Sequence, residues 1–183
     1  MTGSTTTVIV LLRGINVGGK NKLSMADLRA AAESAGYADP TSYLQSGNMI
    51  VRDVAASSVG RVAGDIHDAI ATSTGLDVPI ITRTADEWRA IIDANPFPDA
   101  AAHGTTLHLV VLDGKATGTV KDFDHSKFAP EALGVSGSEV YLLLPDGIGR
   151  SKLAAAVMRL DNTKSGTARN WKTVLALADL SSA

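Results

Sequence analysis

The sequence has no cysteine, few aromatic side chains and no long apolar run. The absence of cysteine excludes disulfides, thiolate metal sites and cysteine nucleophiles. Only 4% of the 183 residues are aromatic, which leaves few side chains on which nucleic-acid bases could stack. No stretch approaches the roughly 18 apolar residues of a membrane span, and no basic segment precedes the apolar N-terminal residues. We therefore expect a cytoplasmic protein with no membrane partner.

The charge and the spacing of histidines exclude further classes of protein. The net charge of −2 at pH 7 gives no global attraction to nucleic acid, so such binding would need a local basic patch. The four histidines lack the short spacings typical of zinc sites; they are His67, His103, His108 and His125. No G-x-S-x-G motif of a serine hydrolase is present. We expect no metal and no cofactor.

The first half of the chain predicts a ferredoxin-like α/β plait over residues 1–84. Residues 5–12 are typical of a buried strand, and Ser24 with Asp27 indicates the start of a helix. Short strands at 43–45 and 49–51, a helix from Val59 and a strand at 78–82 complete the order βαββαβ. This order predicts an antiparallel sheet with strand order 4-1-3-2. Pro79 agrees with it, because the fourth strand lies at an edge, where proline is tolerated.

The second half, residues 85–183, predicts a second plait-like subdomain with a linker helix and a C-terminal helix, so the fold class is α+β. After the linker helix, a buried strand over 105–113, a weak helix near Val120, a hairpin over 132–144 and a helix over 151–160 repeat the order βαββα without a clear last strand. The final helix, 170–180, is expected to place four apolar residues on one face: Trp171, Val174, Leu175 and Ala178.

A glycine-rich, basic loop with the sequence RGINVGGKNK follows the first strand. Gly14, Gly19 and Lys20 match the G-x4-G-K part of a phosphate-binding P-loop. However, Asn21 stands where serine or threonine would bind Mg²⁺, and the predicted hairpins imply antiparallel pairing, whereas a P-loop enzyme needs several parallel strands. Three interpretations remain open: a flexible connection rich in turn residues, an anion or nucleic-acid loop, and a nucleotide-hydrolysing loop.

The turn Gln45-Ser46-Gly47-Asn48 could share a site with this loop. Asparagine and glycine are favoured in a short hairpin for backbone reasons alone. However, the plait makes the first two strands parallel, so the basic loop and this turn leave the sheet at the same edge. Their shared position is what suggests a binding role.

The C-terminal block NTKSGTARNWK, residues 162–172, gathers Lys164, Arg169 and Lys172 around a predicted helix start. Cations beside the exposed amides of a helix N-terminus form an anion site, although such side chains are also often merely solvated. Trp171 is either a core residue or a platform for stacking bases.

Five blocks of the sequence resemble the bacterial family known as domain of unknown function 1697. They span nearly the whole chain and occur in order: LLRGINVGGKNK, YLQSGN, VPIITRT, YLLLPDGIGRSKL and GTARNWKTVLAL. The resemblance implies a fold of two ferredoxin-like α/β subdomains and no established activity, substrate or cofactor. The last family block has a threonine where this chain has Ala168.

The sequence favours a binding module for a phosphorylated small molecule or a nucleic-acid backbone. The alternative is an enzyme, a nucleotide-dependent phosphotransferase or phosphohydrolase that uses residues 14–20, and a third interpretation is a scaffold for protein interaction. The expected ligand-binding residues are Arg13, Gly14, Asn16, Gly19, Lys20, Lys22, Ser46, Asn48, Arg169 and Asn170.

Overall fold

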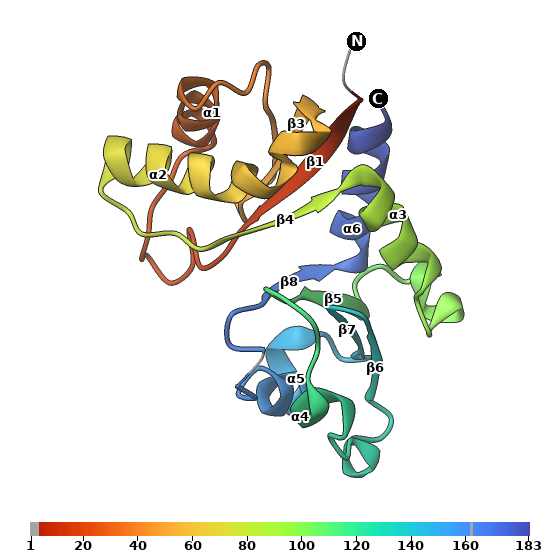
Figure 1. Ribbon diagram of the computed structural model, residues 1–183. Helices are drawn as coiled ribbons and strands as arrows, with labels where there is room; N and C mark the ends of the chain where they lie inside the picture. The colour runs from red at the N-terminus through yellow and green to blue at the C-terminus, as the bar shows by residue number, and fades with distance from the viewer. Residues whose placement is uncertain (1–3, 162) are drawn as a thin grey trace. The chain divides into compact units, whose positions relative to one another are not determined.

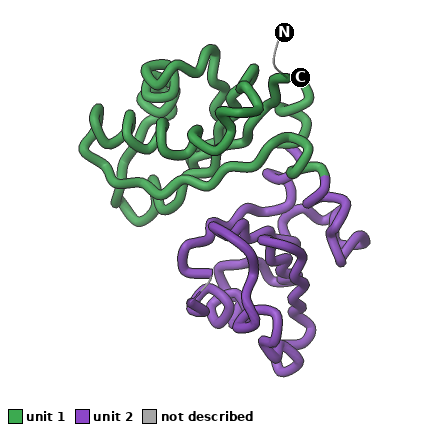
Figure 2. The backbone as a smooth tube through the Cα atoms, in the orientation of Figure 1, with its two compact units in different colours: residues 1–89, 177–183 green, residues 90–176 purple. Residues whose placement is uncertain are grey.

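A computed structural model describes residues 4–161 and 163–183; Asn162, the first residue of the C-terminal block, lies outside them. The chain divides into two compact units, shown in Figure 2. Unit 1 comprises residues 1–89 and 177–183, and unit 2 comprises residues 90–176. Each unit contains its own four-stranded antiparallel sheet with helices packed on it. The two ferredoxin-like subdomains predicted from the sequence are confirmed.

Unit 1 has the predicted element order. Its elements are β1 (Thr5–Leu12), α1 (Met25–Ser34), β2 (Thr41–Tyr43), β3 (Asn48–Ala55), the 3-10 helix η1 (Ala56–Arg61), α2 (Val62–Thr74) and β4 (Ile80–Thr84). Its sheet has the order β2-β3-β1-β4, which is the predicted order. Pro79 immediately precedes the edge strand β4, where its missing N–H costs no internal ladder bond. The strand predicted at 43–45 is β2 at Thr41–Tyr43, because these are the residues that pair with β3. The strand predicted at 49–51 is the longer β3.

The core of unit 1 lies between its sheet and the helices α1 and α2, which cover the same face of the sheet in Figure 1. Alternate residues of β1, including Val8 and Val10, point into this core, as the two-residue period of a strand requires. They meet Leu28 of α1 and Ile66 of α2 there, and all four side chains are completely buried.

Two helices of unit 1 begin with side-chain caps, and the first of them is the cap predicted from Ser24 and Asp27. The Ser24 hydroxyl accepts a hydrogen bond from the Asp27 amide at 3.0 Å, and α1 starts at Met25. At α3 (Ala85–Asp93), the Thr84 amide donates to the Glu87 carboxylate at 2.7 Å, and the Glu87 amide donates back to the Thr84 hydroxyl at 3.2 Å. Each cap satisfies backbone donors that have no partner within the helix.

Unit 2 repeats the architecture of unit 1, with one strand more than the sequence predicts. The strands and α-helices that lie wholly within it are β5 (Leu107–Val111), α4 (Gly118–Lys121), β6 (Ala132–Ser136), β7 (Glu139–Leu143), α5 (Lys152–Val157) and β8 (Thr167–Asn170). Its 3-10 helices are η2 (Pro98–Ala102), η3 (Ser126–Phe128) and η4 (Ile148–Arg150). The sheet order β6-β7-β5-β8 matches that of unit 1 strand for strand.

Residues 167–170, near which the sequence places the start of the last helix, instead form β8 and pair antiparallel with β5. The helix α6 begins one residue later and runs over Trp171–Ser182. Trp171, Val174 and Leu177 are buried along it, whereas Leu175 is 39% exposed. The observed burial shows that Leu177 and not Leu175 continues the face begun by Trp171 and Val174. Trp171 is therefore a core residue.

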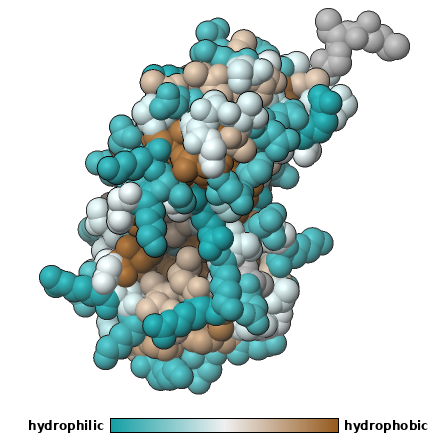
Figure 3. Space-filling view, turned by 90° about the vertical axis from the view of Figure 1, so that its left-hand side faces the viewer, coloured by the Kyte–Doolittle hydropathy of each residue, from teal (hydrophilic) through white to brown (hydrophobic). Residues whose placement is uncertain are grey.

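Most of the surface in the view of Figure 3 is hydrophilic, with apolar residues confined to patches. Among the described residues, the exposed large apolar side chains are Val17, Leu44, Ile148 and Leu175. Val17 and Leu44 belong to the basic loop and to the β2–β3 turn, where the candidate site lies.

Candidate functional site

Residues 13–22, which follow β1 directly, form the cationic loop. Its centre folds into a small hairpin: the Asn16 amide donates to the Asn21 carbonyl at 3.1 Å, and the Lys20 amide donates to the Val17 carbonyl at 3.2 Å. Gly18 and Gly19 form the tip with φ values of 59° and 78°, a left-handed conformation that favours glycine. The loop is thus an ordered hairpin.

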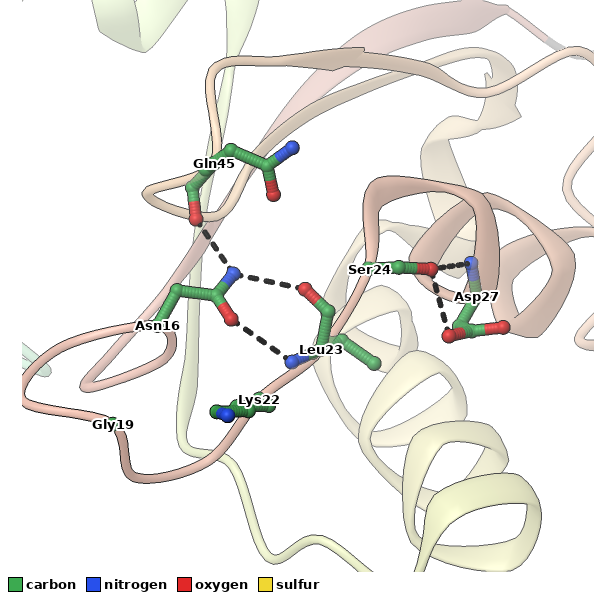
Figure 4. Close-up of a pocket in the computed structure, with 7 residues that line it drawn as sticks. All are labelled: Asn16, Gly19, Lys22, Leu23, Ser24, Asp27 and Gln45. Carbon is green, nitrogen blue, oxygen red and sulfur yellow. Dashed lines mark hydrogen bonds between the residues drawn. The ribbon is translucent and has the colours of Figure 1, made fainter.

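The Asn16 side chain joins the cationic loop to two other segments, as Figure 4 shows. Its Nδ2 donates to the Leu23 carbonyl and to the Gln45 carbonyl, both at 2.8 Å. Its Oδ1 accepts from the Leu23 amide at 3.0 Å. Asn16 therefore holds the loop against both the entry to α1 and the β2–β3 turn, and its amide is occupied by backbone groups.

The β2–β3 turn packs closely on the start of the loop. The Leu12 amide donates to the Gly47 carbonyl at 2.8 Å. A Cβ atom on Gly47 would lie only 2.7 Å from the Leu12 Cβ and 2.8 Å from the Ile15 Cδ1. Position 47 therefore requires glycine, because the turn lies so close to Leu12 and Ile15 and because its φ of 79° is left-handed. The loop and the turn are therefore neighbours, as the parallel arrangement of β1 and β2 predicts.

Asn48 and Ser46 maintain the shape of this turn. The completely buried Asn48 donates from Nδ2 to the Tyr43 carbonyl at 2.9 Å and to the Ser46 hydroxyl at 3.0 Å. A buried amide group needs such partners, because a buried donor or acceptor without a hydrogen bond costs about 1–3 kcal/mol. The two side chains thus fix the backbone of the turn at the edge of the sheet.

Three cations of the loop carry its charge: Arg13, Lys20 and Lys22. Arg13 is half-buried and both lysines are exposed. None of the three side chains has an ion pair or hydrogen bond within residues 4–161 and 163–183, and only the backbone of Arg13 and Lys20 is bonded. Their charges are therefore available to an anion.

An open pocket of about 600 Å³ lies beside the cationic loop. Its lining residues are Asn16, Gly19, Lys22, Leu23, Ser24, Asp27 and Gln45. Figure 4 shows the Gln45 amide reaching over the space between Asn16 and Ser24. The one acid of this lining, Asp27, accepts a hydrogen bond from the Ser24 hydroxyl at 2.7 Å and lies at the N-terminus of α1, which stabilises its negative charge. The sequence marks Ser24 and Asp27 only as a helix cap, and their place in a pocket follows from the folded loop.

The cationic loop does not have the geometry of a P-loop. In a P-loop the backbone amides around the lysine point at the phosphates and a helix follows directly. Here the Lys20 amide is bonded to Val17, and α1 begins only at Met25. The strands around the loop are antiparallel. The interpretation as a nucleotide-hydrolysing loop therefore finds no support in this structure.

Unit 2 contains the corresponding loop without the cluster of cations. The Leu112 amide donates to the Ser138 carbonyl at 2.9 Å, as Leu12 does to Gly47. Asp113 then occupies the position of Arg13, and Gly114 that of Gly14, again with positive φ. Because the same architecture is built with an acid at this position, the fold itself does not require a cation at the position of Arg13.

Arg169 and Asn170 belong to unit 2 and lie at the end of β8. Arg169 is only 7% exposed and donates from Nη1 to the Thr167 hydroxyl at 2.7 Å and to the Ala168 carbonyl at 2.8 Å. Burial lowers the pKa of Arg169 to about 10. The Asn170 Oδ1 accepts from the Thr173 amide at 2.9 Å and caps α6. Both side chains thus have structural partners in their own unit.

Two further kinds of site are absent from the part of the chain that the structure describes. Over residues 4–161 and 163–183, no three histidine, aspartate or glutamate side chains are grouped so that they could hold a metal ion. None of the helices among these residues combines the length and apolar character needed to cross a lipid bilayer.

The fold and its loops define a protein of two ferredoxin-like subdomains, and the comparisons with known proteins agree. The profile of the family DUF1697, described as protein of unknown function, matches residues 5–141, and the chain belongs to this family. The chain is similar to a solved structure, that of the conserved bacterial protein SP0830 from Streptococcus pneumoniae, with a TM-score of 0.73 and 18% sequence identity over 97% of this chain and 99% of that one. This likeness shows the fold. No curated protein matches the chain.

Proposed function

We propose that the cationic loop of unit 1 binds the phosphate group of a phosphorylated small molecule or of a nucleic-acid backbone. The observation that carries the proposal is the set of three cations, Arg13, Lys20 and Lys22, that have no acidic partner among the described residues. Lysine and arginine bind phosphate through charge-assisted hydrogen bonds. The adjoining pocket leaves room for the rest of the ligand.

The ordered backbone supports the same proposal. The Asn16 hydrogen bonds and the packing of Gly47 hold the loop in one conformation before any ligand arrives. A preformed site loses less conformational entropy on binding than a flexible one. The corresponding loop of unit 2, with Asp113 at the position of Arg13, provides an internal comparison in which this charge is reversed.

The experiment compares the wild-type protein with the double variant Lys20→Ala/Lys22→Ala. Binding of three probes is measured by titration at several salt concentrations: a single-stranded oligonucleotide, a mononucleotide and inorganic phosphate. If the backbone of a nucleic acid is the ligand, the oligonucleotide binds much more tightly than the mononucleotide, and the slope of log K against log salt falls by about 0.7 for each lysine contact removed. A small phosphorylated ligand instead gives comparable binding of the mononucleotide and the oligonucleotide.

The matched control is the double variant Lys115→Ala/Lys121→Ala. Both lysines are exposed, and Lys115 lies in the corresponding loop of unit 2, so this variant removes the same charge from the chain. We expect it to bind each probe as the wild type does. Equal affinity of wild type and Lys20→Ala/Lys22→Ala for all three probes would contradict the proposal.

A further inference from the structure

A second cavity in unit 1 is lined by charged side chains of both signs. It has a volume of about 290 Å³ and lies among the connection after α1, the end of β3, η1 and the first turn of α2. It shares no lining residue with the pocket beside the cationic loop. Its volume is at the lower end of the range of about 300–1,000 Å³ that is typical of ligand pockets. The cavity is therefore suited to a small molecule.

Part of this lining is already engaged. The Arg52 guanidinium donates to the Thr41 hydroxyl at 3.0 Å and to the Leu180 carbonyl at 2.8 Å. The Tyr37 hydroxyl donates to Asp65 Oδ2 at 2.8 Å. Burial and this hydrogen bond raise the pKa of Tyr37 to about 12, so its proton stays in place at neutral pH. The second oxygen of Asp65 makes no hydrogen bond within residues 4–161 and 163–183.

Two exposed residues of the cavity lining, Arg61 and Asp53, carry charges that have no partner in the part of the chain that the structure describes. Neither side chain makes a hydrogen bond or an ion pair with any of the described residues. Arg61 lies close enough to Tyr37 for its positive charge to act on the phenol and oppose the rise in that pKa. Arg61 and Asp53 thus both belong to the lining of one small cavity, and their side chains do not pair with each other.

A β-bulge sets the position of Asp53. Thr6 pairs with Val54 and Val8 with Val51, so one residue of β1 faces two residues of β3, Arg52 and Asp53. Asp53 has a φ of 54°, which is uncommon outside glycine although aspartate tolerates it better than most residues. Bulges turn a side chain out of the regular alternation of a strand and are frequent next to functional sites. The strained backbone at Asp53 therefore lies at the cavity, and it carries a carboxylate with no partner among residues 4–161 and 163–183.

We propose that this cavity binds a small zwitterion, specifically a free α-amino acid. The Arg61 guanidinium binds the ligand carboxylate, and the Asp53 carboxylate together with Asp65 Oδ1 accepts hydrogen bonds from the ligand ammonium group. The lining carries two arginines and two aspartates, so a ligand with one charge of each sign leaves it electrically balanced. A singly charged ligand would satisfy only one of the two unpaired groups.

The test is a titration of the full chain, labelled with ¹⁵N, followed by NMR. The probes are L-alanine, L-serine, L-glutamate and L-lysine, with acetate and ethylammonium as singly charged comparisons. We expect at least one amino acid to shift the amide signals of residues 35–38, 52–55 and 58–65 with saturation. The affinity for acetate and for ethylammonium should be lower by a factor of about ten or more. If none of the four amino acids gives saturable shifts there, or if acetate or ethylammonium binds equally well, the proposal is wrong.

Two variants test the assigned groups while preserving the fold. Asparagine tolerates positive φ, so Asp53→Asn keeps the bulge, and Arg61→Gln breaks no hydrogen bond among the described residues. We expect each variant to melt near the wild-type temperature and to lose about tenfold or more in amino-acid affinity. The exposed control variants Asp99→Asn and Arg159→Gln should bind as the wild type does. Wild-type affinity in both cavity variants would overturn the proposal.

This inference is independent of the function proposed for the cationic loop. The double variant Lys20→Ala/Lys22→Ala is expected to bind the amino acid as the wild type does, because neither lysine lines this cavity. A loss of amino-acid binding in that variant would contradict the assignment of the zwitterion to this cavity.

Discussion

At the scale of single residues, the Asn16 amide and Gly47 determine the shape of the candidate site. Asn16 makes three hydrogen bonds to backbone groups of two other segments, and Gly47 fills a place that has no room for a side chain. The sequence predicts that both residues lie at one edge of the sheet, because that depends only on topology. It does not predict the Asn16 bonds, since Leu23 and Gln45 offer only backbone groups, which every residue carries.

Replacing Gly47 by alanine is expected to destabilise unit 1 by about 2–4 kcal/mol, combining left-handed strain with overpacking against Leu12 and Ile15. Unfolding by urea measures the change. Gly36 provides the control, since its φ is also positive, at 93°, but a Cβ there meets nothing within 4 Å. Gly36→Ala should therefore cost only about 1–2 kcal/mol. Equal losses in the two variants would show that the close approach at Gly47 has no energetic effect.

His67 is expected to make stability depend on pH. Its Nε2 lies 2.9 Å from an Asp77 oxygen and its Nδ1 3.1 Å from an Asp68 oxygen, and these contacts raise the pKa of His67. Raising a histidine pKa on folding stabilises the fold fully below the unfolded pKa of about 6.5, and the contribution is lost as the pH rises through the folded pKa. Both aspartates are exposed, so the contribution of these contacts to the free energy of unfolding is on the order of 0.2–1 kcal/mol.

The measurement is the free energy of unfolding of wild type and His67→Gln, at about pH 5.5 and about pH 8.5, on either side of the histidine pKa. The variant should be less stable than the wild type at the lower pH and closer to it at the higher pH. His103→Gln is the control, because the exposed His103 ring makes no ion pair among the residues described. A difference that grows with pH would have the wrong sign for this explanation.

At the scale of elements, strands and helices with a clear apolar pattern could be predicted, and β8 could not. The strand over residues 5–12 and the hairpin over 132–144 are apolar enough to be recognised alone. Of the four residues of β8, only Thr167 favours a strand, whereas Ala168 and Asn170 are of types depleted in strands. They become a strand because β5 offers an unpaired edge, and this backbone pairing is independent of side-chain type. The same pairing buries Arg169, which the sequence predicts as a ligand-binding cation beside a helix start.

The N-terminal cap of α1 contributes stability as well as a wall of the pocket. Ser24→Ala removes the acceptor for the Asp27 amide and should cost about 1 kcal/mol in chemical unfolding. Ser34 lies in the last turn of the same helix, with its hydroxyl bonded to the Ala31 carbonyl. Alanine favours helix there, so Ser34→Ala is expected to be neutral or slightly stabilising. A Ser24→Ala variant as stable as the wild type would contradict the role of the cap.

At the scale of the whole molecule, the chain leaves unit 1 within α3 and returns to it within α6. Within unit 1, Arg52 of β3 holds the returning segment: besides the Leu180 carbonyl, its Nε approaches the Ala183 carbonyl at 3.4 Å. Carbonyl groups at a helix C-terminus have no partner in the helix and carry partial negative charge, so a guanidinium is well suited to them. The sequence alone does not indicate this return, because no pattern in α6 identifies the arginine that receives it.

Arg52→Ala is expected to release the end of α6. Hydrogen bonds to charged groups contribute about 1.5–3 kcal/mol each, so we expect a loss on the order of 2 kcal/mol and faster amide hydrogen exchange in residues 178–183. Arg159→Ala, at an exposed position of unit 2, should leave exchange in that segment unchanged. Unaltered exchange in Arg52→Ala would mean that these bonds do not hold the segment.

The return of α6 to unit 1 also orders events during synthesis. A ribosome produces Arg52 early, but its carbonyl partners only after every residue of unit 2 has been translated. The first sheet can pair co-translationally, and Arg52 can bond to the Thr41 hydroxyl at that stage, but it meets the Leu180 carbonyl only after the residues of unit 2 have been synthesised. A premature stop codon anywhere in unit 2 would thus leave both units incomplete.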